Sequence, residues 1–413
     1  MRSDIFQHVS TDELVKWTMD MVAIPSCSGL PNQEAEVAAY IKNVFDKEGI
    51  PCTIRPLQNG RCNVYATMKG SGGGKSLLFN GHMDTVPAYG MEDAYTPWID
   101  EAQNIHGRGT SDMKGSIASM MAALIAWKRS GEELPGDVIF CGVADEEEAS
   151  IGTIALLEDG IRADAAIVGE PMGDNCIAIA QKGLEWYQVD FHGRTVHGGQ
   201  YRKGIDAIEM AVKYYNKMQE RLVPEIRSRY LEGVGESTIN IGVISGGTQC
   251  STVAGDCYIQ LDRRFLPGVE SYEDCCSELQ AVVDELNAAE DTFHATLKVL
   301  DVSVMIAGYV HQGFIQNPDD PLVQCVASCA ERVIGRKPEF MACPCWTDGG
   351  LLSHYGHMPV VVYGPGEMEY AHSKEEIVEI SALEEYFKAM LKLWENSADR
   401  INRRRSYGSD FER

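Results

Sequence analysis

No apolar run in this sequence is long enough to cross a membrane, and its first residues lack the apolar stretch of a secretion signal. The longest apolar candidate runs only from Ile117 to Trp127. Positive charge is scarce as well, because 36 Lys and Arg stand against 61 Asp and Glu, a formal net charge of −25. That balance argues against nucleic acid or an anionic membrane as the main partner, since both require clustered positive charge. We therefore expect a cytoplasmic protein.

Cysteine is present, but a disulfide framework is not. The 13 cysteines are odd in number and spread from Cys27 to Cys345 without regular spacing, which suits reduced thiols. No Cys-x-x-Cys pair occurs, so the sequence does not support a thiol redox function. Cys325 and Cys329 at helical spacing, and Cys343-Pro-Cys345, leave a soft metal site open as an alternative to burial as small apolar side chains.

The rest of the composition, 44% hydrophobic and 23% charged over 413 residues, indicates a folded chain with two domains. Helix and strand signals alternate up to about Gly183, and a capping box at Ser10–Glu13 opens the first helix. Further helices are expected at 33–48 and 112–129, and strands at 52–57, 63–68, 76–81, 137–144 and 165–169. The alternation predicts an α/β fold, with a mostly parallel sheet, helices on both its faces and a ligand crevice at the carboxyl ends of the strands.

The pattern changes after Gly183. Strand, helix, strand, strand, helix and strand are expected at 184–192, 204–222, 237–244, 257–265, 271–289 and 295–302. This β-α-β-β-α-β order is ferredoxin-like and self-contained. Beyond Val304 the α/β pattern resumes with a helix at 322–334, a strand at 359–363 and a last helix, Lys374–Asn396. We therefore expect one domain made of 1–183 and 304–413, interrupted by an inserted domain at 184–303.

Histidine and acidic side chains follow the apolar strands of the first domain. They are His82 and Asp84, Asp112 after a glycine-rich stretch, the acidic run 145–148, Glu170, and His372 far downstream. Because the carboxyl ends of parallel strands meet at one edge, we expect these side chains to gather there. Nitrogen and carboxylate ligands together suit Zn²⁺, and also Co²⁺ or Mn²⁺. The surplus of carboxylates favours two ions.

Each segment taken alone has a plainer interpretation. His82 with Asp84 is explained by a turn hydrogen bond, Asp112 by a helix N-cap, and the run 145–148 by a solvated face. The acidic run fits its plain interpretation least well. Four carboxylates at the end of a buried strand repel one another unless a cation or a proton compensates.

Taken together, the segments resemble those of a known family. In order they read Gly81-His82-Met83-Asp84-Thr85-Val86-Pro87, Gly107-Arg108-Gly109 with Asp112-Met113-Lys114-Gly115, Asp145-Glu146-Glu147, Gly169-Glu170-Pro171, and Gly364-Pro365-Gly366 with Ala371-His372. This order resembles the family of acetylornithine deacetylase, succinyl-diaminopimelate desuccinylase and glutamate carboxypeptidase, and it covers nearly the whole chain. The resemblance implies a zinc-peptidase-like catalytic domain with an inserted ferredoxin-like dimerisation or lid domain.

The resemblance also implies a site for two divalent ions, most simply Zn²⁺. The implied ligands are His82, Asp112 and Glu170 for one ion, and Asp112, Glu147 and His372 for the other. Glu146 matches the family's general base, and Asp84 would orient His82. Three protein ligands per ion would leave a position open for water, as expected of a catalytic site.

The inserted domain matches the family as well. His197 resembles a histidine that stabilises the oxyanion, in many members from the partner subunit, which implies a homodimer through this domain. Arg264, rather than Arg263, resembles the arginine that binds the substrate's carboxylate. From the residues alone, an ordinary loop histidine and a strand-edge ion pair stay open for His197 and Arg264.

Two positions depart from the family's pattern. Ser251 stands where many relatives have an asparagine, which puts carboxylate recognition near it in doubt. Trp346 is unusually bulky for the family's Thr-Asp substrate region and suggests a pocket of its own. Asp348 in that region and Gly366 complete the expected substrate contacts.

The function that follows is metal-dependent hydrolysis of the amide bond in an N-acyl amino acid, with Glu146 as the base. One alternative is a dipeptidase or carboxypeptidase of the same family, acting on a short peptide. A second, of another class, is a metal-binding protein without activity. The presence of every implied ligand together with Glu146 argues against that last alternative.

Overall fold

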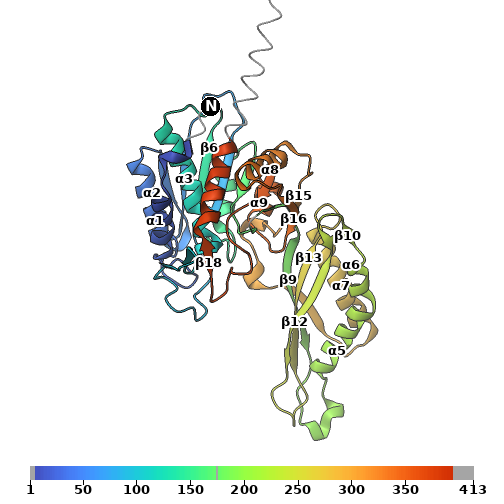
Figure 1. Ribbon diagram of the computed structural model, residues 1–413. Coiled ribbons are helices and arrows are strands. Elements are labelled where there is room, and N and C mark those ends of the chain that lie inside the picture. Colours follow the sequence, from blue (N-terminus) through green and yellow to red (C-terminus); the bar gives the residue numbers. More distant parts are fainter. Residues whose placement is uncertain (1–4, 174, 394–413) are drawn as a thin grey trace, which may run out of the picture. The chain divides into compact units, whose positions relative to one another are not determined.

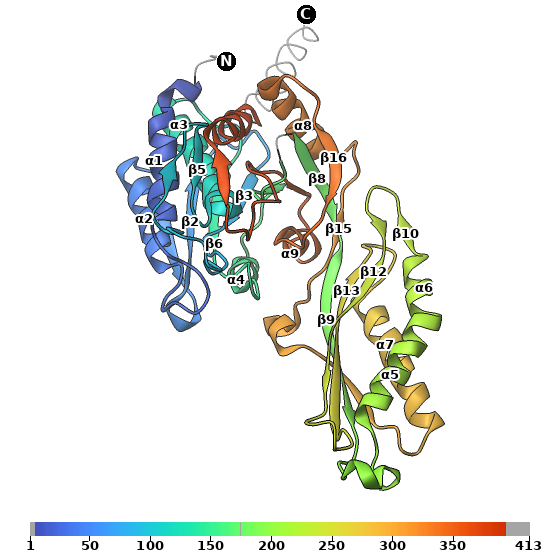
Figure 2. The same ribbon diagram turned by 60° about the horizontal axis from the view of Figure 1, so that its bottom comes forward.

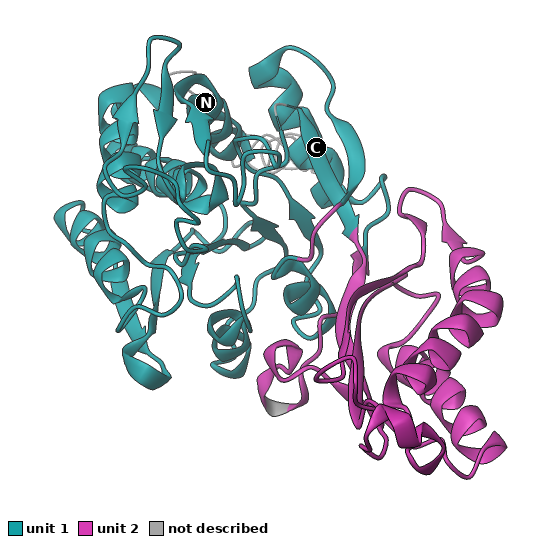
Figure 3. Ribbon diagram, turned by 90° about the horizontal axis from the view of Figure 1, so that it is seen from below, with its two compact units in different colours: residues 1–180, 315–343, 347–413 teal, residues 181–314, 344–346 magenta. Residues whose placement is uncertain are grey.

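The structure is a computed structural model that describes residues 5–173 and 175–393. The chain divides into two compact units, coloured separately in Figure 3. Unit 1 comprises residues 1–180, 315–343 and 347–413, and unit 2 comprises 181–314 and 344–346. The inserted domain expected at 184–303 lies within unit 2, which also takes in the short segment carrying Trp346.

Unit 1 contains a nine-stranded sheet in the order β1-β2-β6-β3-β7-β17-β8-β15, with β16 paired to β8. The strands are β1 (Cys52–Pro56), β2 (Cys62–Met68), β3 (Leu77–His82), β6 (Val138–Val143), β7 (Ala166–Val168), β8 (Cys176–Gln181), β15 (Phe314–Ile315), β16 (Glu339–Cys343) and β17 (Val360–Val362). The four central strands, β6 to β17, are parallel, whereas β1, β2 and β8 pair antiparallel. Figure 2 shows β8, β15 and β16 side by side at one edge.

Helices cover both faces of this sheet (Figure 1). They include α1 (Thr11–Val22), α2 (Ala35–Lys47), α3 (Gly115–Ser130), α4 (Ile151–Glu158), α8 (Pro321–Ile334), α9 (Gly349–His354) and a helix over 380–393. Neighbouring residues of β3 show the two faces, because successive side chains of a strand point to opposite sides. The Asn80 amide donates to Thr153 of α4 at 3.2 Å, whereas a Cβ at Gly81 would meet Ile117 of α3. The predicted α/β fold with a parallel sheet core is therefore confirmed.

Local signals predicted the start of α1 correctly and that of α3 wrongly. The Ser10 hydroxyl accepts the N–H of Glu13 at 3.2 Å, and the Glu13 carboxylate accepts the N–H of Ser10 at 3.0 Å, which is the expected capping box. Asp112 lies instead in a π-helical turn over Thr110–Lys114 with non-helical φ and ψ, so the N-cap interpretation is wrong. Helix α3 begins only at Gly115, and its side chains up to Trp127 are buried.

The last helix also begins later than predicted. Residues expected to open it form β18 (Ile377–Glu379), which pairs with β5 (Asn104–His106) in a three-stranded sheet completed by β4 (Trp98–Ile99). The two β-branched residues of β18 suit a strand, and its partner lies too far away in sequence to be foreseen. The helix runs from 380 to 393, and the rest of the predicted range, to Asn396, lies outside the described residues.

Unit 2 has a four-stranded antiparallel sheet in the order β12-β13-β9-β14. The strands are β9 (Gly183–His192), β12 (Thr238–Gly246), β13 (Asp256–Phe265) and β14 (Ala295–Val299), and the helices packed on them are α5 (Ala207–Lys217), α6 (Val223–Arg227) and α7 (Tyr272–Ala289). The predicted ferredoxin-like order is confirmed. Helix α5 begins at Ala207, three residues after the predicted Gly204, because the Asp206 carboxylate caps the N–H groups of Ile208 and Glu209.

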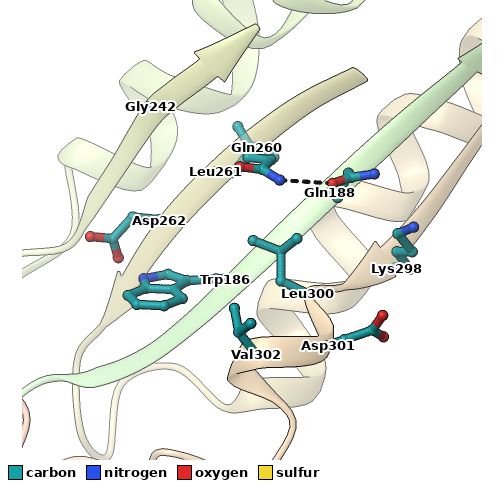
Figure 4. Close-up of a pocket in the computed structure, with 10 residues that line it drawn as sticks. All are labelled: Trp186, Gln188, Gly242, Gln260, Leu261, Asp262, Lys298, Leu300, Asp301 and Val302. Carbon is teal, nitrogen blue, oxygen red and sulfur yellow. Dashed lines mark hydrogen bonds between the residues drawn. The ribbon is translucent and has the colours of Figure 1, made fainter. Parts of the chain in front are cut away.

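The side chains of unit 2 separate cleanly between the two faces of its sheet. On the helix-covered face, Phe191 packs edge-to-face on Tyr214 with ring centroids 5.7 Å apart. On the other face, a cavity of about 470 Å³ is lined by Trp186, Asp262 and neighbouring residues, and the Gln260 amide donates to Gln188 at 2.9 Å (Figure 4).

Among the described helices of either unit, none has the length and apolar character of a membrane span.

Candidate metal centre

The carboxyl end of the parallel sheet in unit 1 collects the histidine and acidic side chains. His82 is the last residue of β3, Glu147 lies in the loop after β6, and Glu170 follows β7. Asp112 comes from the π-helical turn before α3, and His372 from the loop between β17 and β18. The structure therefore brings together residues from five separate segments of the chain at the edge where parallel strands place ligand sites.

His82, Asp112 and Glu170 form the first group, and all three are buried. Nε2 of His82 lies 2.9 Å from Oδ1 of Asp112 and 3.6 Å from Oε1 of Glu170. The candidate ligand atoms of the group lie within 4.8 Å of one another. That spacing allows one small cation to contact all three.

Asp112, Glu147 and His372 form the second group. Nε2 of His372 lies 3.2 Å from Oδ2 of Asp112 and 3.0 Å from Oε2 of Glu147. The side chain of His372 is half-exposed, whereas the two carboxylates are largely buried. Asp112 thus directs one oxygen to each group, as a carboxylate bridging two ions would.

The electrostatics of this cluster fit divalent cations. Burial and the charge of Asp112 raise the pKa of Glu170 to about 7, and hydrogen bonds to Asp112 and Glu147 raise the pKa of His372 to about 10. Burial alone would lower the pKa of His82, but the charge of Glu170 and the contact with Asp112 raise it well above its usual value. Oε1 of Glu170 is buried without a hydrogen-bond partner in the part of the chain that the structure describes. Burial and mutual repulsion disfavour the charged forms of Glu146, Glu147 and Glu170, and bound cations would compensate the same negative charge.

Asp84 holds both His82 and the loop after β6. Nδ1 of His82 donates to the backbone carbonyl of Asp84 at 2.9 Å, which leaves Nε2 as the ring atom on the side of Asp112 and Glu170. The Asp84 carboxylate lies farther from the ring, at 3.7 Å. It accepts instead the N–H groups of residues 145, 146 and 147 at 2.8, 3.3 and 3.1 Å. The orientation of the ring thus comes from the backbone of Asp84 rather than from its carboxylate.

Glu146 lies beside the cluster without being part of either group. Burial and the negative charge of Glu170 hold its pKa well above the usual value. Its backbone N–H is fixed by Asp84, as is that of Glu147. Two adjacent glutamates on a fixed loop can therefore take different roles, one at the cluster and one beside it.

Sequence reasoning missed the partner of Asp145. Arg61, in the turn before β2, pairs with both Asp145 and the buried Glu34. The first carboxylate of the acidic run is therefore neutralised by an arginine rather than by a metal. No local signal in the sequence connects Arg61 with a residue that lies 84 positions away.

Of the expected substrate residues in unit 1, Asp348 is buried and Gly366 is half-buried. Asp348 is 1% exposed and accepts a hydrogen bond from Thr153 of α4 at 2.6 Å, while burial raises its pKa to about 6. Gly366 has φ +90°, and a Cβ there would come within 2.3 Å of Oγ of Ser111. Asp348 is therefore engaged in a hydrogen bond within the protein, and the backbone at position 366 accommodates only glycine.

The remaining expected residues belong to unit 2. His197 is exposed, its Nδ1 accepts the N–H of Gly199 at 3.1 Å, and the N–H of Gly198 donates to the carbonyl of Ser251 at 2.7 Å. Arg264 pairs with Asp262 at 3.0 Å on the face of the sheet away from the helices. This ion pair is the plainer interpretation given above for Arg264, and it leaves the guanidinium partly exposed.

Cysteine does not contribute to a metal site in the described residues. The two groups above are the only sets of three or more candidate ligands found there, and neither contains a cysteine. No disulfide joins any of the 13 cysteines, all of which lie among the described residues. The soft metal site left open at Cys325 and Cys343 is therefore not formed in the part of the chain that is described.

Known proteins resemble this chain over most of its length. The pattern of Peptidase family M20/M25/M40 matches residues 78–396. The N-formyl-4-amino-5-aminomethyl-2-methylpyrimidine deformylase of Halalkalibacterium halodurans is 29% identical over 411 residues, covering 94% of this chain and 95% of that protein. The probable succinyl-diaminopimelate desuccinylase of Staphylococcus epidermidis is 24% identical over 422 residues, covering 93% and 99%. The structure of aminopeptidase PepT from Bacillus cereus has a TM-score of 0.76 at 24% identity, covering 95% and 100%.

The fold and the cluster define an enzyme of the metallopeptidase and amidohydrolase class. Within that class, the chain belongs to Peptidase family M20/M25/M40. The expected family resemblance is thereby confirmed.

Proposed function

We propose that this enzyme hydrolyses the amide bond of an N-acyl amino acid. The observation that carries the proposal is the pair of histidine–carboxylate groups that share Asp112, with Glu146 beside them. His82, Asp112 and Glu170 would hold one divalent ion, and Asp112, Glu147 and His372 the other. Bound Zn²⁺, or alternatively Co²⁺ or Mn²⁺, would polarise the amide carbonyl and lower the pKa of water at the site.

Glu146 is the proposed general base and acid. It takes a proton from the attacking water as the water oxygen bonds to the carbonyl carbon, and it delivers a proton to the amine nitrogen as the carbon–nitrogen bond breaks. Burial and the charge of Glu170 raise its pKa above that of an ordinary glutamate, the direction that favours holding and passing on a proton. The Asp84 carboxylate fixes the backbone of Glu146 by accepting its N–H.

His197 is the proposed oxyanion donor, supplied by the partner subunit of a homodimer. Because Nδ1 accepts the N–H of Gly199, the neutral ring carries its proton on Nε2. An N–H donor is what the developing negative charge on the carbonyl oxygen requires. The exposure of His197 in unit 2 suits a residue that serves another subunit.

Arg264 and Trp346 are proposed to recognise the amino-acid part of the substrate, with Ser251 as a weaker contact. The guanidinium of Arg264 offers a fork of donors to a carboxylate. Trp346 is held rigidly, since its indole N–H donates to the carbonyl of Gln312 at 2.9 Å and its ring packs edge-on against His311 with centroids 4.7 Å apart. A fixed aromatic surface favours a planar or apolar group.

The names of two curated relatives favour the deacylase proposal, although the structural neighbour PepT is named an aminopeptidase. The two curated relatives described above are named as a deformylase and a desuccinylase, so both remove an acyl group from an amine. We propose a cytoplasmic location, because free cysteines persist best where thiols stay reduced.

A release assay tests the proposal. The metal-loaded enzyme is offered N-formyl, N-acetyl, N-succinyl and N-aroyl amino acids beside an N-formyl aminomethylpyrimidine and free di- and tripeptides, with Zn²⁺, Co²⁺ and Mn²⁺ in turn. We expect amine release from one N-acyl amino acid class. Cleavage of free peptides alone would instead make the enzyme a peptidase, release from the pyrimidine alone would remove the amino acid from the proposal, and loaded protein inactive on every compound would point to a binding protein.

A further inference from the structure

Arg108 and Glu376 form an ion pair inside unit 1, 268 residues apart in the chain. The two residues are 1% and 0% exposed. Nη1 of Arg108 donates to Oε2 of Glu376. Neither residue belongs to the candidate ligand groups, and the Gly107-Arg108-Gly109 motif has no role in the function proposed above.

The other carboxylate oxygen of Glu376 holds the loop that carries Asp112. Oε1 accepts the backbone N–H groups of Gly109, Ser111 and Asp112 at 3.0, 3.1 and 3.1 Å. The N–H of Gly107 also donates to the backbone carbonyl of Glu376, at 3.2 Å. Three N–H groups that converge on one anion fix the backbone around it, because hydrogen bonds to a charged acceptor are the stronger kind. The backbone of Asp112 is therefore fixed, because its N–H is one of these three donors.

Arg108 holds two further loops. Its Nε donates to the carbonyl of Pro87 at 3.2 Å, and its Nη2 donates to the carbonyls of Ala88 and Ser373 at 3.4 and 3.0 Å. The first two carbonyls belong to the chain that follows His82, and Ser373 directly follows His372. One guanidinium therefore connects the segments that carry both candidate histidine ligands.

We propose that the Arg108–Glu376 pair is a positioning device that sets the spacing of the two metal groups. It joins the loops of His82, Asp112 and His372, and so the two ion sites are assembled together. The pair acts through backbone contacts and touches neither ion nor substrate. This inference rests on the proposed metal site but not on the proposed substrate.

A purely structural role is the alternative, because breaking any buried ion pair leaves an uncompensated charge and destabilises the fold. Unit 2 offers a matched control for that effect. Arg263 and Glu270 form an ion pair whose side chains are 0% and 2% exposed, and neither belongs to a candidate ligand group. Glu270 also pairs with Arg229, so Glu270→Gln reports what the loss of buried ion pairs does away from the metal groups.

The experiment compares Glu376→Gln, Glu376→Asp, Arg108→Lys and Glu270→Gln with the parent chain. Thermal melting is measured first, and then the dissociation constants for Zn²⁺ and Co²⁺ by chelator competition, together with the visible spectrum of the Co²⁺ form. We expect Glu376→Gln and Arg108→Lys to bind metal about 10–100-fold more weakly and to alter the Co²⁺ spectrum, as is usual when a partner that orients metal ligands is lost. Glu376→Asp, which keeps the charge, should recover part of the loss.

Glu270→Gln should lower the melting temperature while keeping the parent's metal affinity and spectrum. Parental affinity and spectrum in a folded Glu376→Gln or Arg108→Lys would overturn the inference, as would equal losses in Glu270→Gln. If Glu376→Gln does not fold, the metal affinities and Co²⁺ spectra of Arg108→Lys and Glu376→Asp provide the test. A parent chain that binds neither ion would overturn both proposals, whereas one that binds ions but releases no acyl group would overturn only the proposed function.

Discussion

Four successive acidic residues after β6 have four different environments. Asp145 pairs with Arg61, and the Glu146 side chain lies beside the cluster. Glu147 contacts His372, and Glu148 is exposed. Their backbone is held in this arrangement by Asp84, which binds three of the four N–H groups. At the scale of single residues, the proposed roles thus depend on which way a fixed backbone points each side chain.

Replacing Glu146 tests this division of roles. Glu146→Gln should retain both metal ions but lower turnover by about 10²–10⁴-fold, since the amide cannot accept the proton of the attacking water. Metal content by mass spectrometry and steady-state kinetics are the measurements. Glu148→Gln, the same change at an exposed neighbour, is the control and should keep parental turnover. A Glu146→Gln enzyme that works at the parental rate would contradict the assignment of the base.

Glu185 in β9 should make stability depend on pH. Burial raises its pKa from 4.5 to about 7, and it accepts hydrogen bonds from Ser303 and the N–H of Trp186. The native state therefore keeps a proton that the unfolded state loses, and this contribution is present below pH 4.5 and lost as the pH rises through 7. We expect stability to fall by about 3 kcal/mol between pH 5 and pH 8 from this group.

Glu185→Gln is the matched variant, because glutamine keeps the acceptor oxygen but has no proton to lose. In chemical denaturation from pH 5 to pH 8, the stability of the variant relative to the parent should increase as the pH rises. A constant difference between the two proteins across this range would show that Glu185 is not protonated in the native state.

Elements with strong local signals formed where the sequence predicted them, and those defined by distant partners did not. The helices α1 and α7 each begin with a capping box, at Ser10 and Ser271. By contrast, β18 interrupts a predicted helix because it pairs with β5, more than 260 residues earlier in the chain. Local hydrogen bonds can be read from spacing in the sequence, whereas strand pairing depends on the rest of the fold.

The capping box of α7 can be tested on its own. The Ser271 hydroxyl accepts the N–H of Asp274 at 3.0 Å, and the Asp274 carboxylate accepts the N–H of Ser271 at 2.9 Å. Ser271→Ala should lower the free energy of unfolding by about 1 kcal/mol in urea titration. Ser277→Ala, at an exposed position inside the same helix, should be neutral or slightly stabilising because alanine favours helices. Equal effects of the two changes would argue against the cap.

At the scale of the whole molecule, unit 1 is interrupted by a second unit that has its own core. Residues 181–314 leave and re-enter unit 1 between β8 and β15, and their apolar side chains pack among themselves. Such an insert can serve a purpose separate from metal binding. The proposed dimer, in which His197 completes the partner's site, is one such purpose.

Mixed dimers test that arrangement. His197→Ala and Glu146→Gln are each expected to be nearly inactive as pure proteins. Co-expressed with different tags and purified through both, they should regain about half of the parental turnover, because each mixed dimer has one site with both residues intact. A mixed sample as inactive as its components, or an active monomer in sedimentation at the assay concentration, would contradict a role in trans.

The sequence by itself determined the ends of several helices, the ferredoxin-like order of the insert and the segments that form the cluster. These features are encoded in short stretches, by periodic apolar residues, caps and motifs such as the one from Gly81 to Pro87. Only the tertiary structure decided which group neutralises Asp145, which atom of Asp84 holds His82, and that Arg108 meets Glu376. The physical reason is that each of these contacts depends on the geometry of the folded backbone, and two of them join residues 84 and 268 positions apart, a separation that no local spacing records.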